Sequence, residues 1–516
     1  MHVRRMIRYG LTLTAAAGIA GGLLAATPAA GDSDPPAAPE WAACPAGVAT
    51  TLPLECATIP VPLDYDEPEG EQIEIAISRM ASVSPTERRG ILLTNPGGPG
   101  YSGLSLPGEL YDRGIPYSVL NAYDVIGMDP RGVGQSSPVS CGFTLGQAYT
   151  SNIPPYAVDA AGVAAHAEVV KDVAAQCAAN DPEGRMQHMT TANAARDMDT
   201  IRAALGEEKM SFFGLSYGSG LGAAYASLFP ERSDRVLVDS NMGGTSLDRD
   251  TQRRFGLGLE KRFPDFTKWA AKRDDSYGLG STPREVRATY FELAKQYDEQ
   301  PVPGFGGTEF RLYTFLGTYK DAPFATIAQM WQSLKVGDPE AALRQAEQLD
   351  TSVPADPAAA ATEPAEATEP VPNPSDNALS SYLAYTCNDT EWPEDLSTYQ
   401  KDVETDRKRY PLFGAASANI NPCAFWHNDP VDPPLDVNPE GPRNVMVLQN
   451  LRDPATPLLG GELVREAFGD RASLVSVDAG EHGVYVFDDN ACALNTATSF
   501  LVDGELPRRD MFCRAS

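Results

Sequence analysis

The chain has 516 residues, more than one compact core usually needs, and its hydrophobic share of 42% is ordinary for a globular protein. Its formal net charge is −29, because 70 Asp and Glu residues outnumber 41 Lys and Arg residues. Such a surface repels the phosphates of nucleic acids and of anionic lipids, so we exclude both as partners.

The first thirty residues have the layout of a secretory signal peptide. Arg4, Arg5 and Arg8 precede an apolar run from 11 to 26, and residues 27–30, Thr-Pro-Ala-Ala, form a small-residue cleavage site. The run is glycine-containing and short for a membrane span of about 20 residues. We predict export with cleavage near Ala29–Ala30 and no stable membrane association afterwards; a membrane anchor is the alternative. The paired arginines are compatible with the twin-arginine route.

The eight cysteines agree with export, because an even number in an exported chain indicates disulfides. No C-x-x-C pair occurs, which argues against a zinc site. Pairing of sequence neighbours closes the shortest loops. It predicts the bridges Cys44–Cys56, Cys141–Cys177, Cys387–Cys423 and Cys492–Cys513.

Seven short apolar segments are predicted as strands. Several are nearly continuous apolar runs, as in strands buried on both faces. Helical patterns, such as 191–205 and 459–468, separate them, and this alternation predicts a mostly parallel α/β sheet with flanking helices. The predicted strands are 73–78, 91–94, 123–128, 210–213, 235–238, 445–449 and 473–477.

Between 241 and 439 the alternation stops and helical patterns take over. Thr282-Pro283-Arg284-Glu285 is typical of a helix start, and 310–334 and 340–349 also have helical patterns. Residues 351–377 are rich in Pro, Ala, Thr and Glu and are predicted to be a mobile loop. The predicted organisation is a signal peptide (1–30), a sheet domain in two parts (31–240 and 440–516) and a mainly helical cap (241–439) inserted between them.

The chemistry is carried first by Gly214-Leu215-Ser216-Tyr217-Gly218. This G-x-S-x-G pattern follows an apolar strand and runs into a helix of small residues, which is the context of a nucleophile elbow. The flanking glycines let the backbone turn where a Cβ would clash. Ser216 is therefore the candidate nucleophile.

A serine hydroxyl needs a base, and the base needs an acceptor that orients it. His482 lies in a glycine-flanked loop after the last predicted strand, whereas His166 lies in a predicted helix. Asp453 follows the strand before that loop; an ordinary Asp-Pro turn is the alternative. The chain order Ser216, Asp453, His482 is the order of the triad in α/β-hydrolases.

The glycines of Asn95-Pro96-Gly97-Gly98-Pro99-Gly100 also follow a strand. We predict an oxyanion hole from the N–H of Gly97 or Gly98 and that of Tyr217. A plain Gly-Pro turn is the alternative. A phosphate-binding loop is a further possibility, but the Gly-Lys-Ser/Thr of such loops is absent from this segment. The turn 129–136 is interpreted as structural, with Arg131 a candidate to brace the active-site loops by ion pairing.

Five motifs together resemble the secreted bacterial tripeptidyl aminopeptidases, relatives of the prolyl iminopeptidases within the α/β-hydrolases. The resemblance runs from Trp41 to Cys513 and is thin between 300 and 375. Prolyl iminopeptidases usually have His-Gly-Gly-Pro-Gly, and Pro96 replaces that histidine, which favours the tripeptidyl branch. The motifs are residues 95–100, 129–136, 214–220, 452–457 and 481–483.

The resemblance implies a serine exopeptidase that acts on peptides with free N-termini and uses no metal or organic cofactor. In the family, carboxylates of the cap hold the substrate ammonium. The cap segment 384–393 is similar to one in these enzymes, so Asp389 and Glu391 are the implied amine-binding residues, with Trp392 packing against the ligand. A surface loop beside a disulfide is the alternative for this segment.

Two rival functions stay open. An esterase or lipase-like hydrolase would share the triad, and a non-catalytic binding protein could share the fold. The size of the released peptide, the oligomeric state and the role of 351–377 leave no signal in the sequence.

Overall fold

The computed structural model describes residues 38–48, 50–349 and 371–515. The predicted signal peptide and most of the predicted loop 351–377 lie outside these residues. No helix of the described part is long and apolar enough to cross a lipid bilayer.

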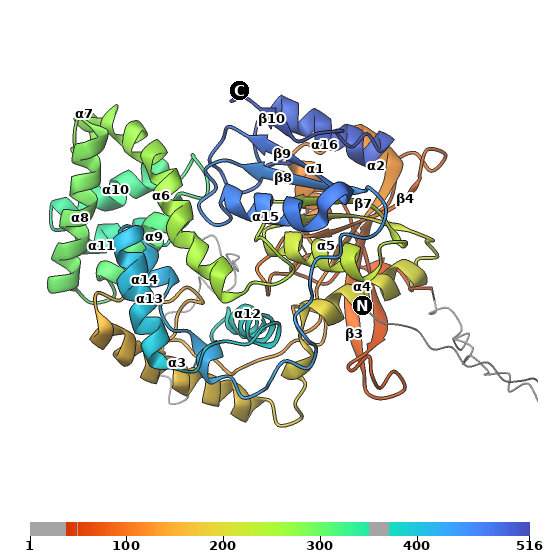
Figure 1. Cartoon of the computed structure of the whole chain (residues 1–516), viewed down its shortest axis with the longest axis horizontal. Coiled ribbons are helices and arrows are strands. Elements are labelled where there is room, and N and C mark those ends of the chain that lie inside the picture. Colours follow the sequence, from red (N-terminus) through yellow and green to blue (C-terminus); the bar gives the residue numbers. More distant parts are fainter. Residues whose placement is uncertain (1–37, 49, 350–370, 516) are drawn as a thin grey trace, which may run out of the picture. The chain divides into compact units, whose positions relative to one another are not determined.

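In the described residues, ten strands form one sheet in the order β1-β2-β3-β5-β4-β6-β7-β8-β9-β10 (Figure 1). From β5 to β10 every neighbouring pair is parallel, whereas β1, β2 and β3 join antiparallel. The sheet therefore confirms the predicted class. The strands are β1 (Ala42–Ala43), β2 (Glu55–Pro62), β3 (Gln72–Met80), β4 (Gly90–Asn95), β5 (Tyr123–Met128), β6 (Met210–Leu215), β7 (Ser233–Asp239), β8 (Val445–Asn450), β9 (Ala472–Val477) and β10 (Met511–Cys513).

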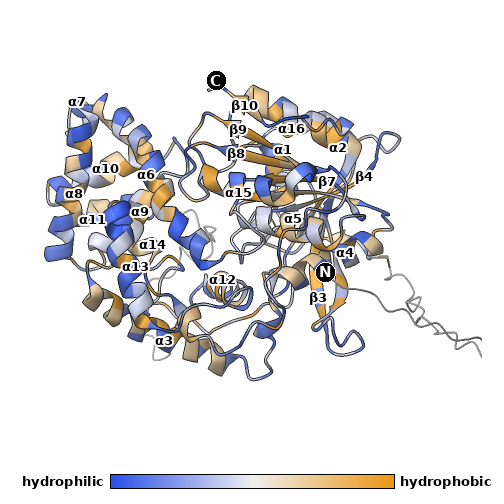
Figure 2. Cartoon of the chain, in the orientation of Figure 1, coloured by the Kyte–Doolittle hydropathy of each residue, from blue (hydrophilic) through white to orange (hydrophobic). Residues whose placement is uncertain are grey.

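Helices cover both faces of the sheet, because alternate side chains of each strand point to opposite sides. Ile91 and Leu93 of β4 face one apolar core, and Leu92 faces the other. The first core packs against α4 (Thr191–Ala204), α5 (Tyr217–Leu228) and α15 (Leu458–Phe468); the second packs against α1 (Leu106–Asp112), α2 (Tyr117–Ala122) and α16 (Ala491–Asp503). Figure 2 shows β8 and β9 as predominantly hydrophobic strands.

Between β7 and β8 the described chain is built from helices with an aromatic core of their own. Phe263, Phe266, Tyr290 and Trp331 are fully buried in this core. As predicted, Thr282 caps a helix, since its side chain accepts the N–H of Glu285. The helices are α6 (Arg249–Ala271), α7 (Asp274–Tyr277), α8 (Pro283–Glu299), α9 (Gly307–Gly317), α10 (Phe324–Lys335), α11 (Pro339–Ala346), α12 (Asp376–Asn388), α13 (Leu396–Arg409) and α14 (Gly414–Ser417).

The helical pattern at 310–334 is interrupted in the structure. It forms α9 and α10, with a break at 318–323. Pro323 precedes α10, where a proline leaves no helical hydrogen bond unmade. The break brings the carbonyl of Tyr319 to the backbone N–H of His482, at 2.7 Å, and the ammonium of Lys320 to Glu481, at 3.2 Å.

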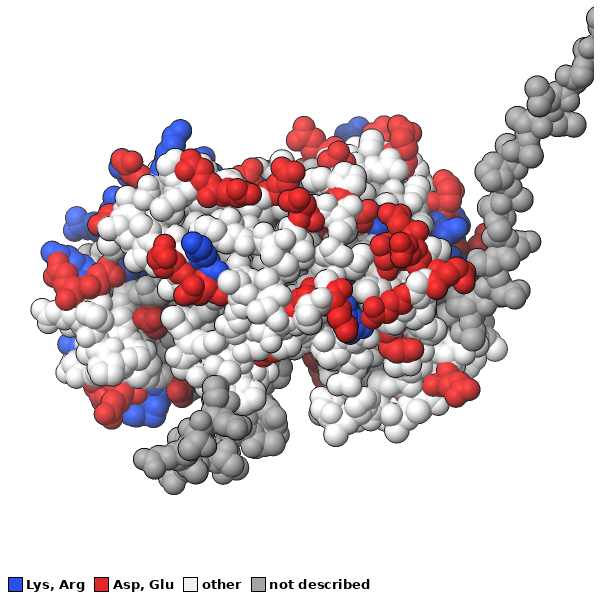
Figure 3. Space-filling model, turned by 90° about the horizontal axis from the view of Figure 1, so that it is seen from below, with Lys and Arg blue, Asp and Glu red and all other residues white. Residues whose placement is uncertain are grey.

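All eight cysteines are paired, and the four predicted bridges are confirmed. Cys387–Cys423 ties the end of α12 to the 3₁₀ helix Pro422–Phe425. Disulfides persist in oxidising compartments, which agrees with export. Figure 3 shows carboxylates at many places on the described face that it presents, in line with the acidic composition.

Candidate active site

Ser216 occupies a strained turn between β6 and α5. Its backbone has φ 60° and ψ −121°, a conformation that a residue other than glycine rarely adopts. A Cβ on Gly214 would come within 2.1 Å of the carbonyl oxygen of Gly218, so the tight turn requires glycine. Such strain is typical of functional positions, and the turn has the backbone geometry expected of a nucleophile elbow.

Asp453 and His482 meet at the carboxyl ends of β8 and β9. The imidazole Nδ1 lies 3.0 and 2.9 Å from the two carboxylate oxygens of Asp453. The side chain of Asp453 is fully buried, and 11% of the His482 side chain is exposed. The N–H groups of Ala455 and Thr456 and the Thr456 hydroxyl each donate to Asp453 at 2.9 Å, so the carboxylate is held in one orientation.

Ser216 and His482 line the same cavity, of about 570 Å³. This volume lies in the range of small-ligand sites. The cavity is also lined by the loop after β4, the segment 148–155, α9 and α12. In the described part of the chain the Ser216 hydroxyl is not hydrogen-bonded to the imidazole; catalytic hydrogen bonds of this kind often tighten only when substrate binds.

The glycine loop after β4 lies against the nucleophile turn. A Cβ on Gly97 would come within 2.9 Å of the Ser216 Cβ and 3.1 Å of the Tyr217 nitrogen. The N–H of Gly97 donates to the side chain of Asn95 at 2.9 Å, so it is already engaged. The N–H of Tyr217, the first residue of α5, has no acceptor within its helix. Gly98 lines the cavity, which leaves Gly98 and Tyr217 as the candidate oxyanion donors.

The sequence of the chain is similar to the sequences of known hydrolases. The family described as "TAP-like protein" matches residues 410–513, and the one described as "alpha/beta hydrolase fold" matches residues 90–287. A tripeptidyl aminopeptidase of Streptomyces lividans is 33% identical over 489 residues, which cover 92% of this chain and 86% of that protein. The chain belongs to the tripeptidyl aminopeptidase family of α/β hydrolases. It is a serine peptidase by this membership.

Two further relatives are more distant. Serine protease Hip1 of Mycobacterium tuberculosis is 26% identical over 472 residues, covering 89% of this chain and 87% of that protein. A protein of the same species named carboxylesterase B is 28% identical over 534 residues, covering 98% of this chain and 97% of that protein. Peptidase and esterase names thus both occur among the relatives of this tripeptidyl aminopeptidase family member.

The turn 129–136 has the structural role expected for it. Arg131 and Asp197 form a fully buried ion pair at 2.6 Å. The guanidinium also donates to the backbone carbonyls of Pro62, Leu63 and His188. Arg131 therefore binds the end of β2 to α4 by an ion pair and hydrogen bonds, and its bracing of the active-site loops stays a prediction.

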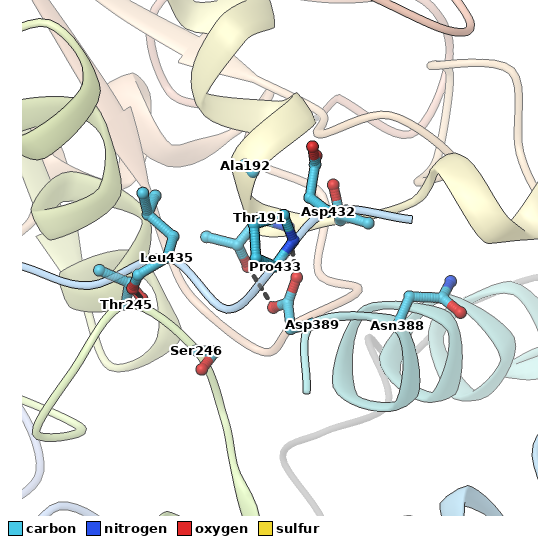
Figure 4. Close-up of a pocket in the computed structure, with 10 residues that line it drawn as sticks. Thr191, Ala192, Thr245, Ser246, Asn388, Asp389, Asp432, Pro433 and Leu435 are labelled. Carbon is cyan, nitrogen blue, oxygen red and sulfur yellow. Dashed lines mark hydrogen bonds between the residues drawn. The ribbon is translucent and has the colours of Figure 1, made fainter. Parts of the chain in front are cut away.

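The structure does not bring Asp389 and Glu391 into the cavity that holds Ser216. Asp389 lies in a small separate pocket, where it accepts the N–H and the hydroxyl of Thr191 at 2.7 and 2.6 Å (Figure 4). Burial raises the pKa of Asp389 to about 7. Glu391 is exposed, and Trp392 is buried with its indole N–H donating to the carbonyl of Thr386.

Sequence reasoning missed two side chains that line the cavity. Glu309 of α9 is the one carboxylate among the described lining residues. One of its oxygens accepts the N–H of Gly306 at 2.8 Å. His166 of α3 (Ala160–Asn180) lines the cavity too, and burial lowers its pKa to about 4, so its imidazole is neutral near pH 7. No local motif marks either residue, because their position depends on how the cap packs against the sheet domain.

Proposed function

We propose that this chain is an exported serine exopeptidase that releases short peptides, most simply tripeptides, from free N-termini. The observation that supports the proposal is the convergence of three side chains. The buried Asp453–His482 pair and the strained Ser216 turn come from separate strand ends, and Ser216 and His482 open into one cavity.

In the proposed mechanism Ser216 attacks the scissile carbonyl carbon. Nε2 of His482 takes the hydroxyl proton and then gives it to the leaving amine, while Asp453 holds Nδ1 and stabilises the imidazolium. The N–H groups of Gly98 and Tyr217 bind the oxyanion, and Gly97 brings their loops together. Water, deprotonated by the same imidazole, then cleaves the acyl-enzyme and frees Ser216.

We propose Glu309, in place of Asp389 and Glu391, as the acceptor for the substrate ammonium. As the one carboxylate among the described lining residues, Glu309 is the group that would attract a cation in this cavity. A hydrogen bond to a charged group contributes about 1.5–3 kcal/mol, so Glu309→Gln should raise KM for free-amine peptides by about 10- to 100-fold. Acetylated substrates should show no such change. Glu391→Gln is the matched control, because that carboxylate is exposed.

The test of the whole proposal has three arms. Wild-type protein and Ser216→Ala are compared for fluorophosphonate labelling, for cleavage of free and acetylated tripeptide anilides, and for digestion of a peptide library read by mass spectrometry. We expect labelling of the wild type only and release of fragments of one length from free N-termini. Absence of labelling would overturn the proposed role of Ser216.

Esterase action is the second candidate, favoured by the relative named carboxylesterase B. Faster turnover of small acyl esters than of any peptide, with no preference for a free amine, would assign the chain to this class. Export has its own test: Edman sequencing of protein recovered from the medium should start just after Ala29 or Ala30.

A further inference from the structure

Asp389 is a buried carboxylate that the proposed mechanism does not use. It follows the last residue of α12, and both of its oxygens accept donors of Thr191, the first residue of α4. Figure 4 shows the Asp389 side chain pointing at Thr191 across the small pocket. The carboxylate thus joins the cap to the N-terminus of a helix in the sheet domain.

The hydrogen bonds continue from Thr191 to the nucleophile turn. The Thr191 hydroxyl lies 2.6 Å from the phenolic oxygen of Tyr217. When Asp389 is ionised it only accepts, so Thr191 gives its one hydroxyl proton to Asp389 and Tyr217 donates to Thr191. The result is a series of hydrogen bonds that runs from Tyr217 through Thr191 to Asp389.

Each end of this hydrogen-bonded series adjoins an element that contributes to the wall of the catalytic cavity, because Asp389 follows α12 and Tyr217 follows Ser216. Ala378, Leu379 and Tyr382 of α12 line the cavity wall. Tyr217 directly follows Ser216, and its ring packs edge-on against Tyr385 of α12, with centroids 5.7 Å apart. α12 and α5 are therefore joined directly by the two rings and indirectly by hydrogen bonds through Thr191 of α4.

We propose that Asp389 is a positioning residue, which acts through Thr191 and Tyr217 to align the α12 wall of the cavity with the backbone N–H that follows Ser216. This inference rests on the proposed function, in which that N–H binds the oxyanion. Oxyanion donors act because they are pre-organised, and a displacement of about 1 Å can cost about 100-fold in rate.

The experiment removes the hydrogen bonds of this series one after another by substitution. Tyr217→Phe removes one hydroxyl and leaves the Thr191–Asp389 contact intact, Thr191→Val removes the central hydroxyl at nearly constant shape, and Thr191→Ser keeps it. Tyr225→Phe is the matched control: it removes a buried phenol from the same helix, where Tyr225 donates to Asp199 and to the carbonyl of Arg232. Each variant is measured for kcat, KM, inhibition by a peptide boronate and thermal unfolding.

We expect Tyr217→Phe and Thr191→Val each to lower kcat about tenfold, to weaken the boronate in parallel and to leave KM nearly unchanged. Thr191→Ser should restore the wild-type rate. The double variant Thr191→Val/Tyr217→Phe should be no slower than Thr191→Val alone, because both substitutions interrupt the same series of hydrogen bonds.

The inference is overturned if Tyr217→Phe loses no more kcat than Tyr225→Phe, or if the double variant shows the product of the two single losses. Fluorophosphonate labelling rates separate this outcome from failure of the proposed function. They report the Ser216 site in every variant, even if the wild type cleaves no peptide. Should Thr191→Val fail to fold, Tyr217→Phe against Tyr225→Phe still decides.

Discussion

The carboxylate of Asp239 accepts the backbone N–H of Tyr485 at 2.7 Å, and both of its oxygens lie 3.0 Å from the N–H of Val484. These residues belong to the loop that carries His482. The backbone carbonyl of Asp239 accepts the N–H of Ser216 at 3.0 Å. One buried residue at the end of β7 therefore connects the nucleophile turn with the histidine loop.

We predict that Asp239→Asn lowers kcat by about 10- to 100-fold with a smaller change in KM, because an amide group turns a donor toward one of the two loop N–H groups and shifts His482. Steady-state kinetics on a tripeptide anilide check this. Asp129→Asn is the matched control: that carboxylate is equally buried at the end of β5, but it accepts from Ser102, Gly103 and Gln135. Equal kcat losses in both variants would contradict the role of Asp239.

Stability should depend on pH through two buried carboxyls. Burial raises the pKa of Asp239 and of Asp389 to about 7. An unfolded chain releases such protons near pH 4, so between about pH 4 and about pH 7 the native state binds more protons than the unfolded state. The free energy of unfolding should therefore decrease as pH rises through this window.

Guanidinium unfolding with intact disulfides checks this. Asp239→Asn and Asp389→Asn should gain stability relative to the wild type as pH rises, because each removes one titrating group. Glu391→Gln, at an exposed site, should follow the wild-type curve. Parallel curves for all four proteins would show that neither buried carboxyl has a raised pKa.

Asp453→Asn should lower kcat by about four orders of magnitude, as expected when a triad carboxylate is replaced by an amide that cannot hold the imidazole in the required tautomer. KM and thermal stability should change little in comparison. Asp478→Asn is the control on the neighbouring loop, since its side chain is 41% exposed. A loss of less than about tenfold would remove Asp453 from the triad.

Gly97→Ala should abolish most activity, because its Cβ would meet the carbonyl oxygen of Leu215 at 2.6 Å and push the glycine loop away from Ser216. Loss of one oxyanion donor lowers kcat by about 10²- to 10³-fold. Gly47→Ala is the control for backbone strain. Gly47 has φ 107°, close to the 102° of Gly97, but no atom lies near its added Cβ, so this variant has the strain without the clash. Similar kinetics in both variants would contradict the prediction.

Arg131→Met should cost about 3–5 kcal/mol of unfolding free energy, because it leaves Asp197 buried without its partner. The double variant Arg131→Met/Asp197→Leu should recover part of this loss. Denaturant titration of the wild type, both single variants and the double variant gives the coupling. Additive losses would mean that the pair contributes no interaction of its own.

The central strands could be predicted from the sequence because they are continuous apolar runs. β2 could not, because Pro60 and Pro62 argue against a strand. They are tolerated since β1 pairs only with Glu55 and Cys56, so the proline half of β2 has one neighbour, β3.

The candidate site could be proposed from the sequence where it has local motifs, and its residues were missed where their position depends on packing. Ser216, Asp453 and His482 each have a local signature and a fixed order. Thr191 and Asp389 lie far apart in the sequence but are hydrogen-bonded in the structure. Asp389 is buried in this contact and does not line the cavity that holds Ser216. No pattern around Asp389 distinguishes a buried acceptor from a ligand-binding acid.

The break between α9 and α10 has a consequence for anyone who wishes to exchange caps among homologous enzymes. The donor cap must supply a carbonyl to the backbone of His482, as Tyr319 does here. A chimera joined only at the ends of β7 and β8 would acquire a new cap wall for the cavity but lose the hydrogen bond from the backbone N–H of His482 to the carbonyl of Tyr319. Grafts that retain residues 318–323 from the recipient should keep more turnover than grafts that replace them.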